Sequence, residues 1–510
     1  MMKNIIKCMF AAIMLCSISV FTSCSSDDDE QVPGGVEKRD RARYTVIIYG
    51  NAGGHMDDLI EGTWDKLKPM LDDSTNVRVC VVYKYGMASN SFKGKYGKPN
   101  DLVMFELNSK TDLTKLHETS AVSASEFRLY DPKSLASYIK YVKEYAPADN
   151  YIFAIWGHGG GYDVTSDRPD NMVTTRAMLY DEALEGEAMS MYQLSDALAT
   201  CGNTHFKLIM LHNCLMGNIE TLTEIQPYAD YFWASSHSLA SIGDPIITMV
   251  DKLKNSTDYN FEDRAKEMFT DLRRIYTNRE GIPADIAKEM SDVNMDFKII
   301  RSDDLTVLNN NLNFFITRLL ELYPTLSPEV MERAMTASAY SYEVFYPYLI
   351  DLRHYIQTVA AAINDPELSA HAKNAIDCMD KSVVDRWDEA KESSKLRKFY
   401  LSVSLPYHDF LHYTTNGNYT VAESYYPSAF NRRTGWALWM NTNTYFPTKW
   451  MFNTEKVSAD ADMTKDIFFK LLDQLNKNEQ EEYPEGYQED YPEEYQEGYQ
   501  EGYQEEITGY

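Results

Sequence analysis

Tyr151-Ile-Phe-Ala-Ile-Trp-Gly-His-Gly-Gly-Gly-Tyr162 is the stretch that decides the fold class of this chain. It opens with an apolar run that predicts a buried strand and continues into a glycine-rich loop. A second stretch, His212-Asn-Cys-Leu-Met-Gly-Asn-Ile-Glu220, follows another such run, Phe206–Leu211. His158 and Cys214 therefore lie where a strand ends and a loop begins. In open α/β sheets ligands bind at that edge, and a thiol near an imidazole is the minimum equipment for covalent attack on a carbonyl.

Strands and helices alternate on both sides of these two stretches. Further strands are predicted at Tyr44–Tyr49, Val77–Tyr83, Leu102–Leu107 (a candidate edge strand) and Tyr231–Ala234. Helical spacing predicts helices at Met56–Leu71, Pro132–Tyr145, Met191–Cys201 and Gly217–Gln226. This alternation predicts an α/β fold, a mainly parallel sheet flanked by helices.

The second half of the chain is predicted to be mostly helical. From about Phe261 to Arg386 the apolar spacing is helical, Phe399–Leu405 predicts a late strand, and Tyr425–Trp439 has helical spacing. We therefore assign residues 44–260 to an α/β core and residues 261–475 to a helical insertion or C-terminal elaboration, whose late strand and helix complete the core. Residues 476–510 are acidic, with tyrosine at every fourth position over much of their length, and their composition predicts disorder.

The first 23 residues have the pattern of a signal peptide. Their apolar run, Cys8–Phe21, is shorter than the ~20 residues that a membrane-spanning helix needs. Phe21-Thr-Ser-Cys24 resembles a bacterial lipoprotein signal in which Cys24 is lipidated, and an ordinary cleaved secretory signal is the alternative. Residues 24–43 are then a polar tether, and their acidic start resembles the surface-export signal of Bacteroides-type lipoproteins. We expect a lipid-anchored protein of the bacterial cell envelope, on the outer membrane, with exposure at the cell surface as a further option.

The bulk composition excludes some partners and cofactors. The formal net charge of -28 argues against nucleic acid, because neutralising phosphates needs clustered Lys and Arg. The cysteines beyond Cys24 are too few and scattered for a disulfide framework, and no pair has zinc-finger spacing. A metal site formed by His158, His212, Cys214 and His237 is an alternative, but their separations fit no recognised spacing. The residues by themselves therefore predict no metal and no cofactor.

The two strand-end loops have the composition of a catalytic site. The pKa of a Cys214 thiol would be lowered by His158 and by the start of a helix near Gly217. The glycines at 159–161 let the backbone approach a ligand, and the amides of Gly159 and Cys214 are candidates to stabilise an oxyanion. For Cys214 alone, the alternative is an inert buried thiol. For His158 alone, the alternative is a structural residue of the turn. Together, at the ends of two strands, they favour a catalytic dyad.

The same residues resemble a known family. Residues 151–162 resemble the histidine motif of clostripain-type cysteine peptidases, and residues 213–220 resemble their nucleophile motif. Tyr44–Tyr49 and Leu401–Pro406 resemble a first and a later strand of that family, and the order His then Cys is that of the wider caspase-like group. The resemblance spans roughly residues 44–440. It implies a caspase-like fold and a cysteine endopeptidase that acts on proteins or peptides as a monomer, with calcium as a cofactor that the family would admit.

The resemblance also implies substrate-binding roles for Asn213, Ser235 and Asp244. Three departures weaken the implied preference for Arg or Lys before the scissile bond. His212 replaces a usually acidic residue, residues 50–54 lack the usual Asp-Asn, and residues 234–238 lack an acidic pair. Asp244 is the remaining candidate to anchor a basic side chain. A catalytically weak peptidase fold that acts as a surface binding module is the alternative function.

A maturation cleavage is the last expectation from the sequence. Residues 162–178 are polar and predict an exposed loop, and exposed loops are preferred sites of nicking. The resemblance implies cleavage there after a basic residue. Pro169 hinders cleavage after Arg168, so Arg176 is the better site. A simple surface loop is the alternative.

Overall fold

The structure is a computed structural model. It describes residues 40–51, 56–71, 76–86, 95–108, 114–115, 127–162, 178–181, 187–240, 242–256, 260–327, 330, 349–391, 398–404, 428–434 and 436. The predicted signal peptide with Cys24, the loop with Arg168 and Arg176, and the Tyr-rich tail lie outside the described residues.

A nine-stranded sheet is the centre of the described part of the chain, in the order β12-β10-β9-β8-β5-β1-β2-β3-β4. Neighbours among β9, β8, β5, β1 and β2 pair in parallel, and the outer strands on both sides pair antiparallel. The predicted α/β fold with a mainly parallel sheet is confirmed. The strands are β1 (Ala42–Asn51), β2 (Val77–Lys84), β3 (Leu102–Leu107), β4 (Thr114–Lys115), β5 (Ala148–Trp156), β8 (Phe206–His212), β9 (Ala229–Ala234), β10 (Met295–Arg301) and β12 (Val383–Glu389).

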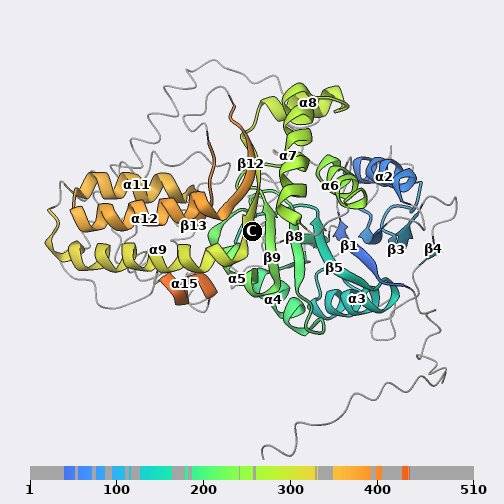
Figure 1. Cartoon of the computed structure of the whole chain (residues 1–510), viewed down its shortest axis with the longest axis horizontal. Coiled ribbons are helices and arrows are strands. Elements are labelled where there is room, and N and C mark those ends of the chain that lie inside the picture. Colours follow the sequence, from blue (N-terminus) through green and yellow to red (C-terminus); the bar gives the residue numbers. More distant parts are fainter. Residues whose placement is uncertain are drawn as a thin grey trace, which may run out of the picture. The chain divides into compact units, whose positions relative to one another are not determined.

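Helices cover both faces of this sheet (Figure 1). In β1, Ile47 packs into the core on one face and Ile48 into the core on the other, because side chains alternate along a strand. A strand buried on both faces is typical of parallel sheets between helical layers. The first face carries α3 (Pro132–Tyr145), α4 (Met191–Thr200), α5 (Ile219–Ile225) and part of α9 (Ser302–Leu322). The second carries α2 (Met56–Leu67), α6 (Asp244–Lys254), α7 (Phe261–Asn278) and α8 (Ala284–Ser291).

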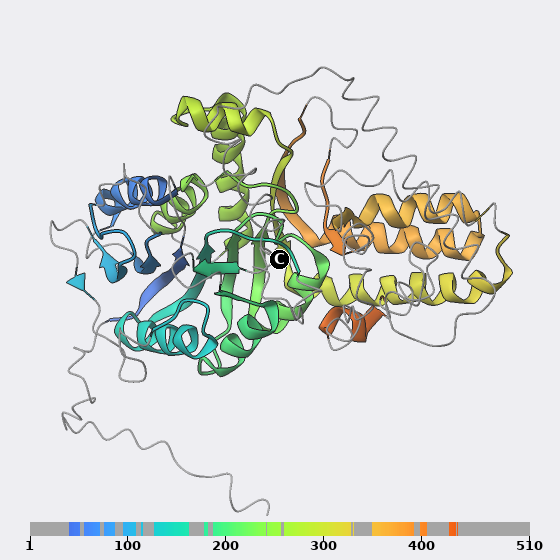
Figure 2. The same cartoon turned by 180° about the vertical axis from the view of Figure 1, so that it is seen from behind.

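A helical layer extends from the β10–β12 side of the sheet. Helix α9 follows β10 directly, and α12 leads directly into β12. Figures 1 and 2 show α9, α11 and α12 lying side by side. This layer is the predicted helical elaboration, and no described helix is long and apolar enough to cross a membrane. The remaining helices are α11 (Leu352–Ile363), α12 (Pro366–Ser382), α15 (Ala429–Thr434) and the short 3-10 turns η1 (Lys68–Met70), η3 (Gln226–Tyr228) and η4 (Tyr323–Thr325).

The sequence pattern was misleading in two places. The range predicted as helical, Phe261–Arg386, contains β10 and the start of β12, which extend the central sheet. Both carry several charged residues, so neither has the apolar run of an interior strand. The late strand is also different, because β13 (Ser402–Ser404) pairs with β11 (Leu349–Asp351) in a separate two-stranded sheet. A third sheet pairs β6 (Met178–Asp181) with β7 (Glu187–Met189).

The parallel strands bring the two motif loops to one edge. Gly50 at the end of β1 is in register with Trp156 of β5, and Trp156 is in register with His212 of β8. The loops that follow these strands therefore leave the sheet side by side. Residues 157–162 and 213–218 are those loops.

Candidate active site

The Asn213 side chain joins the histidine loop to the cysteine loop. Its Nδ2 donates hydrogen bonds to the carbonyl oxygens of Gly157, at 2.9 Å, and of His158, at 3.0 Å. Asn213 is fully buried. The backbone of His158 is thereby held against the residue that immediately precedes Cys214.

Gly159 lies so close to the cysteine loop that a side chain does not fit. A Cβ atom there would lie 2.7 Å from Asn213 Cβ and closer still to the Cys214 carbonyl oxygen. Real Cβ atoms essentially never come that close to other heavy atoms, so a larger residue would push the loops apart. Gly159 also forms a backbone bridge with Met178. Glycine at this position is thus a requirement of the contact between the loops.

The Cys214 thiol is half-buried at the turn after β8. Its Sγ accepts a hydrogen bond from the Leu239 N–H at 3.3 Å and lies 3.7 Å from the Leu239 carbonyl oxygen. Leu215 and Leu349 pack beside it. Burial raises the pKa of the Cys214 thiol above its usual value, and the Leu239 hydrogen bond offsets this only in part. The direction is opposite to the lowered thiol pKa expected from the sequence, because burial disfavours the thiolate.

The turn that presents Cys214 is strained. Leu215 has a φ of 64°, in the left-handed region that non-glycine residues rarely occupy. The surrounding structure compensates, because Leu215 N donates to the His237 carbonyl oxygen at 2.9 Å. Strain of this kind concentrates at functional sites.

His158 and His212 lie in opposite environments. His158 is exposed to solvent, after the end of β5. His212 is buried, and its ring stacks on Trp156 with 4.6 Å between centroids. Burial lowers the pKa of His212 to about 4, so its ring is neutral at pH 7. Of the two, His158 is the one that can exchange protons with solvent.

The three residues expected to bind substrate are distributed over different elements. Asn213 forms the clamp described above, and Ser235 is fully buried, with its Oγ 3.1 Å from Asp296 Oδ1. Asp244 begins α6, and its carboxylate lies 4.0 Å from the Lys66 ammonium group of α2. Burial raises the pKa of Asp244, and the Lys66 charge opposes that rise. The side chains of Asn213 and Ser235 thus form hydrogen bonds with other residues of the chain, and Asp244 is paired with Lys66.

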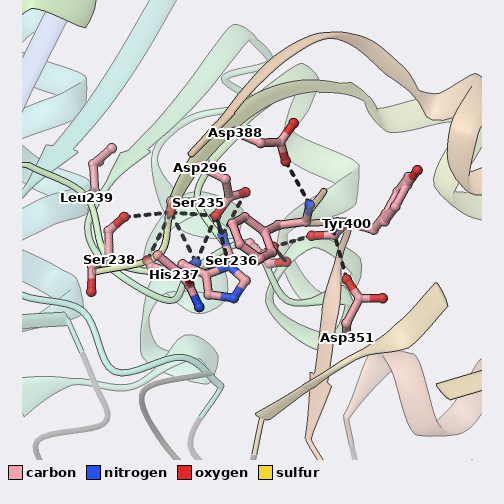
Figure 3. Close-up of polar contacts among 12 residues, drawn as sticks. Ser235, Ser236, His237, Ser238, Leu239, Asp296, Asp351, Asp388 and Tyr400 are labelled. Carbon is pink, nitrogen blue, oxygen red and sulfur yellow. Dashed lines mark hydrogen bonds and ion pairs between the residues drawn. The ribbon is translucent and has the colours of Figure 1, made fainter. Parts of the chain in front are cut away.

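Sequence reasoning missed two charged residues of β10, Asp296 and Lys298. Both are fully buried, and they form an ion pair. Figure 3 shows the Asp296 carboxylate beside the Ser235–His237 turn. The turn that lacks the expected acidic pair is therefore supplied with a carboxylate from a neighbouring strand. The signal was the alternation Asp296-Phe297-Lys298-Ile299, which is typical of a strand with two charges on one face.

The described residues contain no group of three or more His, Cys, Asp and Glu side chains placed to hold a metal ion. His158, His212, Cys214 and His237 are all among those residues, so the alternative metal site is not formed by them.

The comparisons with known proteins agree with this architecture. The sequence model of the clostripain family matches residues 56–470. Because this is well over half of the chain, the protein belongs to the clostripain family, a family of cysteine peptidases. No curated protein matches the chain.

Solved structures with the same fold include secreted proteases. A secreted C11 cysteine protease from Bacteroides thetaiotaomicron, "iotapain", has a TM-score of 0.55 at 14% sequence identity, covering 78% of this chain and 100% of that one. An inactive zymogen C11 protease from Parabacteroides distasonis has a TM-score of 0.50 at 16% identity, covering 78% of this chain and 99% of that one. At these identities the likeness is one of fold.

Proposed function

We propose that the chain is a cysteine endopeptidase with a His158–Cys214 dyad. His158 takes the thiol proton as general base, and Cys214 Sγ attacks the carbonyl carbon of the scissile peptide bond. The imidazolium then protonates the leaving amine, and water hydrolyses the thioester. The amides of Gly159 and Cys214 are our candidates to stabilise the oxyanion.

The observation that carries this proposal is the junction between the two loops. The Asn213 clamp and the Gly159 contact hold the histidine loop and the cysteine loop against each other. Such a junction restricts the relative motion of a base and a nucleophile, and orientation of this kind makes a large contribution to rate.

The lowered pKa of His212 and the solvent exposure of His158 explain why His158 is our choice of base. A group whose pKa is lowered to about 4 by burial accepts a proton poorly at pH 7. His158 is exposed and can accept one. Because burial favours the neutral Cys214 thiol, attack needs such a base.

Kinetics of three proteins test the dyad. Wild type, Cys214→Ala and His158→Ala are compared on a mixed peptide library, with cleavage products identified by mass spectrometry. We expect cleavage by wild type and a loss of at least 100-fold in kcat for each variant. Cleavage by Cys214→Ala at the wild-type rate would refute the dyad, and a wild type that cleaves no peptide would favour the binding-module alternative.

Specificity for Arg or Lys is a finer part of the proposal. Asp244 is the candidate anchor, because a carboxylate can bind a guanidinium through two hydrogen bonds. Lys66 is its present partner at 4.0 Å, so a substrate side chain would have to compete with Lys66.

Location, cofactors and maturation complete the proposal. We propose lipidation at Cys24 and attachment to the outer membrane, cleavage after Arg176, and action as a monomer on protein or peptide substrates. We propose no organic cofactor, and the family leaves a calcium requirement open. Retention of full activity after dialysis against a calcium chelator would argue against that requirement.

A further inference from the structure

The Ser235–Leu239 turn is organised around the Asp296 carboxylate of β10. Its Oδ1 accepts hydrogen bonds from the backbone N–H groups of Ser236 and His237, both at 3.0 Å, and from Ser235 Oγ at 3.1 Å. His237 Nδ1 lies 3.2 Å from the same oxygen. The other oxygen, Oδ2, pairs with the Lys298 ammonium group. Donors from three consecutive residues of the turn therefore converge on one buried carboxylate (Figure 3).

The same turn supports the loop that carries Cys214. The His237 carbonyl oxygen accepts the hydrogen bond from Leu215 N, and Leu239 N donates to Cys214 Sγ. The Ser235 carbonyl oxygen accepts a hydrogen bond from Gly217 N. A Cβ atom at Gly217 would lie 2.6 Å from the Ser235 carbonyl carbon, so the two backbones are in close contact at this point. The position of the turn therefore determines the position of the thiol.

A segment from late in the chain holds the cluster from its other side. Lys298 Nζ donates to the Tyr400 carbonyl oxygen at 3.0 Å, and the Ser236 hydroxyl group contacts the same oxygen. Tyr400 N donates to Asp351 Oδ2 at 3.0 Å, and Ser402 N donates to the Gly217 carbonyl oxygen at 3.1 Å. The Asp296–Lys298 pair thus lies at the junction of β10, the turn and residues 399–402.

We propose that Asp296, neutralised by Lys298, is a positioning residue that holds Cys214 in its reactive place through the Ser235–Leu239 turn. This inference rests on the proposed function of Cys214 as the nucleophile. Buried ion pairs add little net stability compared with neutral residues of similar volume, so stability alone does not account for the pair. Its contacts reach the thiol through one intervening turn.

The test removes both charges together. The variant Asp296→Asn/Lys298→Met keeps an acceptor oxygen and an aliphatic stem, and it leaves no unpaired buried charge. The control variant Glu262→Gln/Arg301→Met neutralises a second ion pair of β10, at the end of the strand where Arg301 Nε lies 2.6 Å from Glu262 Oε1. Three quantities are measured on each protein: kcat and KM on a peptide substrate, the melting temperature, and the iodoacetamide alkylation rate of each cysteine by peptide mapping.

In the double variant, the alkylation rate of Cys214 and kcat are expected to change in opposite directions. A released turn lets water reach the thiol, so alkylation of Cys214 at pH 7 should become at least threefold faster while kcat falls at least tenfold with KM within threefold. The fully buried thiols of Cys80 and Cys201 should stay unlabelled, which excludes general unfolding. The control variant should match wild type in kcat and in Cys214 alkylation.

Wild-type values of kcat and of Cys214 alkylation in the double variant would overturn the positioning role, whereas labelling of Cys80 and Cys201 would show that this variant is unfolded. If the double variant does not fold, His237→Phe removes one donor to Asp296 and keeps an aromatic ring against Phe399. That variant should show the same opposite changes at about half the size on a logarithmic scale, and wild-type rates in it would overturn the proposal. A wild-type chain that cleaves no peptide would refute the proposed function alone, because the alkylation ratio still decides the positioning role.

Discussion

His212 and Cys214 lie two positions apart, and burial favours the neutral form of both. It lowers the pKa of the His212 ring to about 4 and raises the pKa of the Cys214 thiol. A reactive thiolate therefore has to come from a base outside this buried environment, and His158 is exposed. At the scale of single residues, the solvent exposure of the two imidazoles separates a candidate catalyst from a core residue.

His212 should make stability depend on pH. Its pKa is about 4 in the folded chain and 6.5 as the usual value, so the unfolded chain binds the proton more readily between these values. The contribution of His212 to the free energy of unfolding is then fully present above about pH 6.5 and falls by about 3 kcal/mol as the pH drops to 4. We expect His212→Phe to lose this part of the pH dependence in urea unfolding at pH 7 and pH 4.5.

The matched control for that experiment is His205→Gln. His205 is exposed, with its Nε2 2.7 Å from Asp230, so this variant should keep the contribution of His212. If wild type and His212→Phe lose stability equally between pH 7 and pH 4.5, His212 is not a buried neutral group.

Asp244 should decide the preference for basic substrates. If its carboxylate binds Arg before the scissile bond, Asp244→Asn should lower kcat/KM for Arg substrates by about 10-fold to 100-fold, the value of a charged hydrogen bond. Asp251→Asn, on the exposed side of the same helix, is the control and should have no effect. Peptide-library profiling measures both, and an unchanged Arg preference in Asp244→Asn would move the anchor elsewhere.

At the scale of elements, the contact between the histidine loop and the cysteine loop leaves no room for an added side chain. Gly159→Ala would force Cβ into the Asn213 and Cys214 backbone region, so the loops must separate. We expect kcat to fall at least tenfold. Gly62→Ala is the control, because a Cβ in that position of α2 meets nothing within 4 Å, and it should stabilise the fold by about 1 kcal/mol.

The two glycine variants are compared by steady-state kinetics and urea unfolding. Full activity in Gly159→Ala would mean that the loops are not held in the contact described here.

The elements that the sequence predicted well are those with a strong local pattern. The interior strands β1, β5 and β8 are buried on both faces and appear as continuous apolar runs. Strands β10 and β12 lie toward one edge and carry several charges, so their pairing depends on neighbours that sequence spacing does not reveal.

The same reasoning applies to the candidate site. His158 and Cys214 were found because each follows an interior strand directly. Asp296 comes from a strand far along the chain, and its contact with the Ser235–His237 turn exists only after β9 and β10 have paired. The neutral state of His212 also depends on tertiary burial, which the residues beside it in sequence do not fix.

At the scale of the whole molecule, Cys24 should decide where the protein is found. We expect labelled fatty acid to enter wild type and the protein to sediment with membranes. Cys24→Ala should abolish both, because the lipid chains supply the membrane affinity. Cys16→Ala, inside the predicted signal, is the control and should still be lipidated. Membrane attachment of Cys24→Ala would contradict the proposed anchor.

Arg176 should be the site of maturation. Mass spectrometry of purified wild type should find two fragments that separate after Arg176, whereas Cys214→Ala should remain one chain. Arg176→Gln should block this cleavage, and Arg168→Gln should not, because Pro169 already disfavours cleavage after Arg168. Cleavage that persists in Cys214→Ala would indicate another protease, and a fully active uncleaved wild type would show that no maturation step is needed.

The central claim is that Cys214, activated by His158, attacks peptide carbonyls. Its most direct test is covalent labelling with an Arg-terminated peptide chloromethyl ketone, followed by peptide mapping of every cysteine. The claim predicts one adduct, on Cys214, that forms at least 100-fold more slowly in His158→Ala. Labelling of another cysteine such as Cys378 in place of Cys214, or equal rates in wild type and His158→Ala, would contradict it.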